Sequence, residues 1–241
     1  KLESMICLVE DYVYDDINTT SNQLINAGLN NLFGEVIWFY CTSGSNVINR
    51  MVTYNYIDSS PQRPIWTTGS LNRTTWSDSA VFGKPYATHY DADTDTSYDV
   101  TGNTDGITTF YEQETGNDQI KRGVTTAIAA SIESGDYDIT QDERQGVTFR
   151  GDGEFLMSIR RFIPDFLTQT GNTQVTLNLR NYPNESQTSS SLGPFTISSS
   201  TTKVDTRARA RSVALKVENT STAQDWKIGT FRLDIQASGR R

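Results

Sequence analysis

The chain contains only one histidine and two cysteines among its 241 residues, and it has no long apolar run. Any histidine-based triad or histidine-rich metal site would have to be built around His89, which lies in a polar, acidic stretch without a nucleophile turn. We therefore expect a surface-loop histidine. Cys7 and Cys41 lie in apolar, strand-like runs, which favours small buried side chains over a disulfide framework. No run approaches the roughly 18 apolar residues that a membrane-spanning helix needs.

Basic residues are also outnumbered. The chain has 21 Lys and Arg against 29 Asp and Glu, a formal net charge of −8. Proteins that bind nucleic acid tightly are usually basic, because their affinity comes from neutralising phosphates. The balance argues against a dedicated DNA-binding protein. It is compatible with a surface along which DNA slides without sticking, and equally with ordinary solubility.

Strand patterns dominate the first half of the sequence. Residues 36–41 form an apolar run, and residues 49–57 alternate after a Gly- and Asn-containing turn, so the pair predicts an antiparallel hairpin. Residues 65–69 continue the pattern, with a Trp ahead of a Gly, as in many β-propeller blades. The only helical candidate is a weak one over residues 21–31.

The second half of the sequence reads as further strands. Residues 154–163 and 174–180 alternate, with Val175, Leu177 and Leu179 expected to be buried. In the first of these strands we expect one face to carry Phe155, Met157, Ile159 and Arg161. We predict an all-β protein, with β-propeller blades followed by antiparallel sandwich-like or closing-blade strands. The predicted regions are a propeller-blade region (1–87), an acidic polar loop excursion (88–107) and a terminal antiparallel β region (108–241).

Three arginines near the C-terminus are spaced two residues apart. On an extended strand, Arg207, Arg209 and Arg211 share one face. One interpretation is a row that faces phosphate, and the other is a seam of ion pairs to acidic residues within the chain or across a subunit boundary. The acidic chain favours the seam. These three residues are our candidates for a subunit interface.

The acidic stretch has the beginning of a calcium-loop pattern in Asp91, Asp93 and Asp95. An EF-hand loop needs Gly at its sixth position and Glu at its twelfth, where this chain has Thr96 and Gly102. A solvated turn is therefore our default expectation, and a loose calcium site is the alternative. We predict no cofactor and no metal site.

Carboxylates and tryptophans are the side chains of this sequence that could act on sugars. Glu112 and Glu114 are expected to share a strand face, with Asp118 nearby, and glycoside hydrolysis needs two facing carboxylates across a cleft. Sheet surfaces carry Glu routinely, so we expect no enzyme. The tryptophans could stack on sugars, but their strand patterning favours packing within the sheets. They are Trp38, Trp66, Trp76 and Trp226.

Several segments together resemble a phage virion family. They are residues 66–87, 111–116 and 162–166, followed by the Arg207–Arg209–Arg211 row, residues 226–229 (Trp-Lys-Ile-Gly) and the final Gly-Arg-Arg. From about residue 34 to its end, the chain is similar to the tail nozzle, or tail tubular protein B, family of short-tailed, podovirus-like phages. Since the chain starts at Lys1 without Met, we expect it to be the C-terminal portion of such a protein.

The resemblance implies a propeller-based structural subunit of a virion ring, a hexamer, at the distal end of the tail. The ring would be assembled in the host cytoplasm. Its implied partners are further copies, a tail adaptor protein, tail fibres and the genomic DNA, which the ring retains and then conducts without sequence readout. No catalytic residues come with the resemblance. The alternatives are a tail-associated carbohydrate-binding or glycan-cleaving β-propeller, and an accessory neck or fibre-attachment protein.

Overall fold

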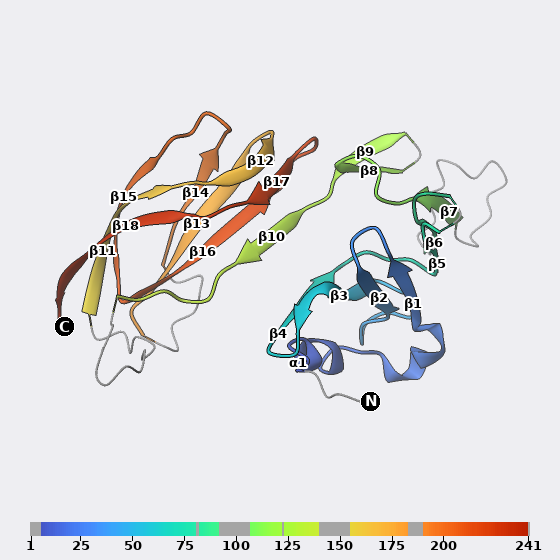
Figure 1. Ribbon diagram of the computed structural model, residues 1–241. Helices are drawn as coiled ribbons and strands as arrows, with labels where there is room; N and C mark the ends of the chain where they lie inside the picture. Colours follow the sequence, from blue (N-terminus) through green and yellow to red (C-terminus); the bar gives the residue numbers. More distant parts are fainter. Residues whose placement is uncertain are drawn as a thin grey trace. The chain divides into compact units, whose positions relative to one another are not determined.

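The computed structural model describes residues 6–80, 82–91, 107–121, 123–139, 155–182 and 190–240. The chain divides into two compact units, a first unit of Lys1–Thr115 and a second unit of Gly116–Arg241 (Figure 1). With 59% strand and 6% helix in several antiparallel sheets, the all-β prediction is confirmed. The predicted boundaries at residues 87 and 107 fall inside the first unit, around residues 92–106, which lie outside the described part.

The first unit is built on a four-stranded antiparallel sheet whose strands follow one another in sequence order. The strands are β1 (Asn26–Asn30), β2 (Glu35–Tyr40), β3 (Arg50–Ser60) and β4 (Arg63–Gly69). β2 and β3 form the predicted hairpin, with Ile37 opposite Thr53 and Phe39 opposite Met51. The alternating apolar residues therefore specify both the pairing and the buried face.

The predicted helix over residues 21–31 is wrong. A short α-helix, α1 (Glu10–Tyr14), precedes a 3₁₀ helix over Thr19–Leu24, and the chain then enters β1. The Asn18 side chain caps the 3₁₀ helix by accepting a hydrogen bond from the Thr20 N–H at 3.0 Å. After the 3₁₀ helix, the backbone N–H and C=O groups of β1 form hydrogen bonds with β2. This tertiary pairing overrides the weak local helical pattern.

The two faces of this sheet differ. One face carries the core of the first unit, formed by Ile37, Phe39, Cys41 and Ile48, with Trp76 packed against it. Trp76 belongs to a second antiparallel sheet of β5 (Thr75–Ser77), β6 (Tyr86–Asp91) and β7 (Ile107–Glu112). The opposite face carries aromatic side chains, and we call this group the aromatic face; its members are Trp38, Tyr54 and Trp66.

The second unit places two antiparallel sheets on one core. The first has the order β10 (Ala130–Glu133), β16 (Ser212–Asn219), β13 (Thr173–Arg180), β14 (Ser191–Ile197), and the second has the order β15 (Val204–Ala210), β11 (Phe155–Ile163), β18 (Arg232–Arg240). Both sheets contribute fully buried residues, such as Leu177 from β13 and Met157 from β11. Two two-stranded antiparallel sheets complete the unit, one of β8 (Asp118–Lys121) with β9 (Val124–Ala127) and one of β12 (Phe166–Thr170) with β17 (Asp225–Ile228). None of the described sheets closes on itself, so the predicted propeller is not confirmed.

An irregularity in β11 changes which of its side chains face the core. Met157 and Ile159 are buried two residues apart, but the next buried residue is Phe162. The register of β11 shifts against both neighbouring strands between Ile159 and Arg161, as at a β-bulge. The bulge turns Arg161 outward, and Phe162 fills the core position. The expectation that Arg161 shares the face of Met157 and Ile159 is therefore wrong.

Candidate interaction surface

Strand β15 separates core residues from arginines by strict alternation. Thr206, Ala208 and Ala210 are buried, whereas Arg207 and Arg209 lie exposed on the opposite face. Arg211 lies just beyond the strand, where the chain turns into β16, and its backbone N–H donates to the Arg180 carbonyl at 3.1 Å. The structure thus places two of the three predicted arginines on one strand face and the third at the following bend.

The neighbouring strands add further basic residues to this side of the sheet. Arg160 is exposed at the bulge of β11, and Arg232 is exposed at the start of β18. We call the group of Arg160, Arg207, Arg209 and Arg232 the arginine face. Sequence analysis missed Arg160 and Arg232. The alternation of Arg232 with the core-packed Leu233 and Ile235 was a signal that could have revealed the second of them.

The two carboxylates on this sheet already have cationic partners. Arg161 Nε lies 3.8 Å from Asp205 Oδ1 and 3.4 Å from Asp234 Oδ2. Lys203 Nζ lies 2.9 Å from Asp205 Oδ2, and its hydrogen bond lowers the pKa of the Asp205 carboxyl. Arg161 therefore bridges carboxylates of both flanking strands, which ties the three strands together at their outer surface.

The described part of the chain supplies no such partners to the arginine face. Within the residues that the structure describes, none of its four members forms an ion pair with a carboxylate. Arg209 donates from Nη2 to the Ser238 carbonyl oxygen at 2.7 Å, which fixes its side chain across β11. The guanidinium groups thus lie exposed above a tightly packed core, a geometry suited to recognising anionic groups from outside.

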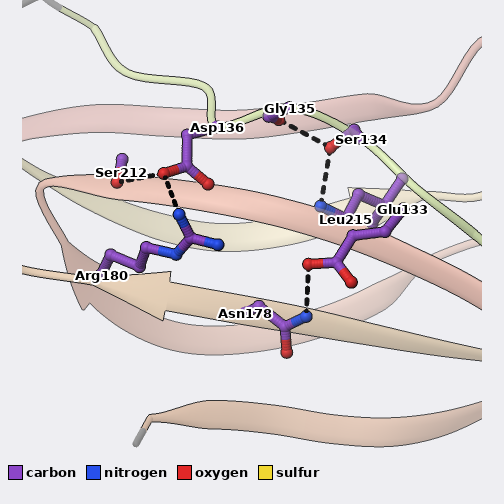
Figure 2. A network of polar contacts seen from close by, with 8 residues as sticks. All are labelled: Glu133, Ser134, Gly135, Asp136, Asn178, Arg180, Ser212 and Leu215. Atoms are coloured by element: carbon purple, nitrogen blue, oxygen red, sulfur yellow. Dashed lines mark hydrogen bonds and ion pairs between the residues drawn. The ribbon is translucent and has the colours of Figure 1, made fainter. Parts of the chain in front are cut away.

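Arg180, in the same unit, shows the contrasting situation (Figure 2). Its Nη1 lies 3.0 Å from Asp136 Oδ2, and that carboxylate also accepts from Ser212 Oγ at 3.4 Å. Nearby, Asn178 Nδ2 donates to Glu133 Oε1 at 2.9 Å. These contacts hold the segment after β10 onto β13 and β16. The unit therefore pairs Arg180 with one of its own carboxylates, whereas among the described residues no carboxylate pairs with a member of the arginine face.

Two single-residue expectations need correction. His89 is buried in β6 beside Asn72, whose Nδ2 lies 3.2 Å from His89 Nε2, so it is not a surface-loop residue. Pairing of β6 with both β5 and β7 encloses it despite the acidic sequence around it. Cys41 is buried as expected, and burial raises the pKa of its thiol, whereas Cys7 is exposed. Neither cysteine forms a disulfide.

The candidate carboxylates for glycoside cleavage each have a separate role. Glu112 ends β7 and lies 3.2 Å from Lys84 Nζ, whereas Glu114 lies beyond the strand with φ at 56° and accepts from Asn30 Nδ2 at 2.9 Å. The two therefore do not share a strand face, contrary to expectation. Asp118 accepts from the Ala223 N–H at 2.9 Å. Asn30 is almost fully buried, so the Glu114 contact is part of the packing of the first unit.

The proposed calcium-loop pattern falls on Asp93, Asp95 and the side chain of Asp91, all outside the described residues. In the part that is described, no cluster of three or more His, Cys, Asp or Glu side chains has an arrangement suited to a metal ion. Nor does any described helix combine the length and hydrophobicity that crossing a bilayer requires. The tryptophans divide between packing sites: Trp76 and Trp226 lie against the two cores, and Trp38 and Trp66 lie on the aromatic face.

A comparison with protein-family models and a search of curated proteins each found no match to this chain.

Proposed function

We propose that this protein is a structural subunit of the tail nozzle ring of a short-tailed phage, which retains genomic DNA and then conducts it. The proposal rests on the sequence resemblance together with the architecture of the two units. The role is mechanical and needs no bond to be made or broken. The protein would act in the virion, as one copy among several in a homo-oligomeric ring below a tail adaptor protein, with tail fibres as further neighbours.

The observation that carries this proposal is the arginine face. Its exposed guanidinium groups have no carboxylate partner among the described residues and are held on a sheet with a fully buried core, which suits them to contact another macromolecule. A sheet of this kind resists deformation because its inner side chains interdigitate with those of the opposing sheet. An assembly that must hold DNA under pressure needs such rigid contacts between its subunits.

The strand order of the first unit supports the β-propeller that the family resemblance implies for such a subunit. A propeller blade is a four-stranded antiparallel sheet in sequence order that packs against a neighbour on each face. Sheet β1–β4 has that strand order, and both of its faces carry large apolar side chains. On the aromatic face, the ring centroids of Trp38 and Trp66 are 6.1 Å apart, and those of Tyr54 and Trp66 are 4.8 Å apart. These half-buried rings offer a surface for a further blade.

The charge balance fits the conduction of DNA. With a formal net charge of −8, a channel built from this chain would repel phosphates along its wall and would not create strongly attractive positions. A duplex could then slide under the pressure of packaging. The nozzle would retain DNA by closing its bore, not by binding the duplex.

The test is to locate the protein in virus particles. Gold-labelled antibodies against the purified chain should mark the distal end of the tail, and particles assembled without the protein should lose their packaged DNA. Labelling of the capsid shell, or the absence of the protein from purified particles, would contradict the proposal. Rotational averaging of tail images should give the six-fold symmetry that the resemblance implies.

A carbohydrate-binding or glycan-cleaving function is the second candidate, and the aromatic face is the observation that favours it. Tryptophan rings on a sheet surface can stack on sugars. Titration with host surface polysaccharide should then quench tryptophan fluorescence, and a Trp38→Ala, Trp66→Ala double variant should lose that response. Release of reducing sugars would further indicate cleavage. Absence of both signals with intact polysaccharide would remove this candidate.

A further inference from the structure

The two units of the chain carry very different charge. Lys1–Thr115 holds 5 basic and 15 acidic residues, a formal charge of −10, and Gly116–Arg241 holds 16 basic and 14 acidic residues, a formal charge of +2. The net charge of −8 is therefore the sum of a strongly acidic first unit and a slightly basic second unit. The two units have net charges of opposite sign, so electrostatics favours contact between the second unit of one copy and the first unit of another.

Exposed charges without partners occur on both units. The second unit pairs Arg161, Arg180, Lys203 and Lys216 with its own carboxylates. It leaves the four members of the arginine face without one in the described residues. Several basic side chains of this unit therefore form ion pairs within it, whereas those of the arginine face do not in the described part.

On the first unit, α1 and the residue after it present carboxylates to solvent. Glu10, Asp11 and Asp15 are exposed, and none of them forms an ion pair in the part of the chain that is described. Asp16, immediately after them, lies 3.9 Å from Arg50 Nη2, so the local basic residue is already engaged. We call Glu10, Asp11 and Asp15 the α1 carboxylates.

We propose that the arginine face of one copy docks on the α1 carboxylates of a second copy. Such a contact joins two different surfaces, and repeated contacts of this kind close into a ring when the rotation allows. The proposal rests on the ring of the proposed function and adds the surfaces that form its subunit boundary. Of the two interpretations of the arginine row, it adopts the ion-pair seam between subunits.

Nucleic acid is the competing partner for the arginine face. A duplex is uniformly negative, so it gains no attraction from the first unit, whose formal charge is −10. A second copy can contact the arginine face with the acidic side chains of its first unit. Its own arginine face then remains free for a third copy. The charge distribution therefore favours the second copy.

The test measures self-association of the full chain by sedimentation velocity. Wild-type protein should form oligomers that dissociate as NaCl is raised from about 50 mM to about 500 mM, because salt screens exposed ion pairs. The Arg207→Glu, Arg209→Glu double variant should raise the dissociation constant by about tenfold or more, since it places like charges across the boundary. An unchanged circular dichroism spectrum and thermal midpoint would show that it is folded.

A matched control is the Arg63→Glu, Lys227→Glu variant, which changes the net charge by the same amount at two other exposed positions. It should associate like the wild type. Adding Asp11→Lys and Asp15→Lys to the arginine variant should restore association, because the charges are then exchanged across the same boundary.

Several outcomes would overturn the proposal. They are a wild-type chain that stays monomeric at low salt, an arginine variant that associates normally, and an exchange of charges that restores nothing. An arginine variant that associates normally but loses binding to a fluorescein-labelled DNA duplex would assign the face to nucleic acid instead. Localisation of the protein at the tail tip does not depend on which face joins the copies, so failure here is distinct from failure of the proposed function.

Discussion

The indole ring of Trp76 lies directly over the backbone of Gly28, and its Nε1 donates to the carbonyl oxygen of the adjacent Leu29 at 2.7 Å. A Cβ atom placed on Gly28 would come within 2.3 Å of Trp76 Cδ1 and 2.8 Å of its Cβ. The rigid ring cannot move aside without leaving the core of the first unit. The glycine is therefore required by the close approach of two sheets, not by an unusual backbone conformation.

We expect Gly28→Ala to lower the free energy of unfolding of the first unit by about 1–3 kcal/mol, as overpacking of a close contact does. Urea denaturation followed by tryptophan fluorescence measures this change. Gly44→Ala is the control, since a Cβ there meets nothing within 4 Å, and it should stay within about 0.5 kcal/mol of the wild type. Equal effects at the two positions would contradict the packing of Trp76.

Two isoleucines of β11 test the orientation of that strand. Ile159 is 0% exposed and Ile163 is 38% exposed. Ile159→Ala should therefore destabilise the second unit by about 2–5 kcal/mol through lost burial and a residual cavity. Ile163→Ala should cost no more than about 1 kcal/mol. Chemical denaturation gives both values, and a larger loss at Ile163 would mean that the bulge between them is misplaced.

Hydrogen exchange tests the network around Asp136. Removal of the guanidinium in Arg180→Ala should loosen the segment after β10, so that the amides of Ser134 and Tyr137 exchange faster. Those amides donate to the Leu215 and Val213 carbonyl oxygens at 2.9 and 2.8 Å. Lys203→Ala removes a different ion pair of the same unit and should leave their exchange unchanged. Mass spectrometry of exchanged peptides distinguishes the two results.

Stability should depend on pH through Glu35. Burial raises the pKa of its carboxyl and repulsion from Glu114 adds to the shift, while the hydrogen bond from Asn30 opposes it. A carboxyl whose pKa is higher in the folded than in the unfolded state adds to the free energy of unfolding at acidic pH. This stabilisation is lost as the pH rises through the folded-state pKa. Glu35→Gln should therefore stabilise the first unit near pH 7 but not near pH 4.

Denaturant midpoints at the two pH values measure this dependence, with Glu112→Gln as the control. Glu112 is ion-paired with Lys84 at 3.2 Å, so its neutralisation should be slightly destabilising near pH 7. A Glu35→Gln variant that is less stable than the wild type near pH 7 would show that the Asn30 hydrogen bond outweighs the burial of the charge.

Alternating side chains predicted much of the fold. The buried positions Val175, Leu177 and Leu179 and the β2–β3 hairpin are as expected, because a half-buried strand must place apolar groups at every second residue. The bulge in β11 was missed because its two neighbouring strands determine it, and those strands lie elsewhere in the sequence. His89 was missed for a related reason, since pairing on both sides of β6 buries it despite its acidic neighbours.

The candidate surface was predictable only along a single strand. Spacing alone placed Arg207 and Arg209 on one face, and β15 confirms that placement. Arg160 and Arg232 join them because β15, β11 and β18 are neighbours in space, and no local pattern shows which strands will pair. The sequence also did not show that Asp205, the nearest carboxylate on the same strand face as Arg207, pairs with Arg161 and Lys203 instead.

The inner side of β15 is made of small residues. Ala208 and Ala210 are buried, and Thr206 is held by a hydrogen bond from its Oγ1 to the Ile159 carbonyl oxygen at 2.8 Å. Substitutions at positions 207 and 209 therefore leave the interior untouched. Mutation at position 207 can change which partner the protein accepts without touching the core, whereas mutation at position 209 also removes the hydrogen bond to Ser238. Recognition and folding can therefore evolve most independently at Arg207.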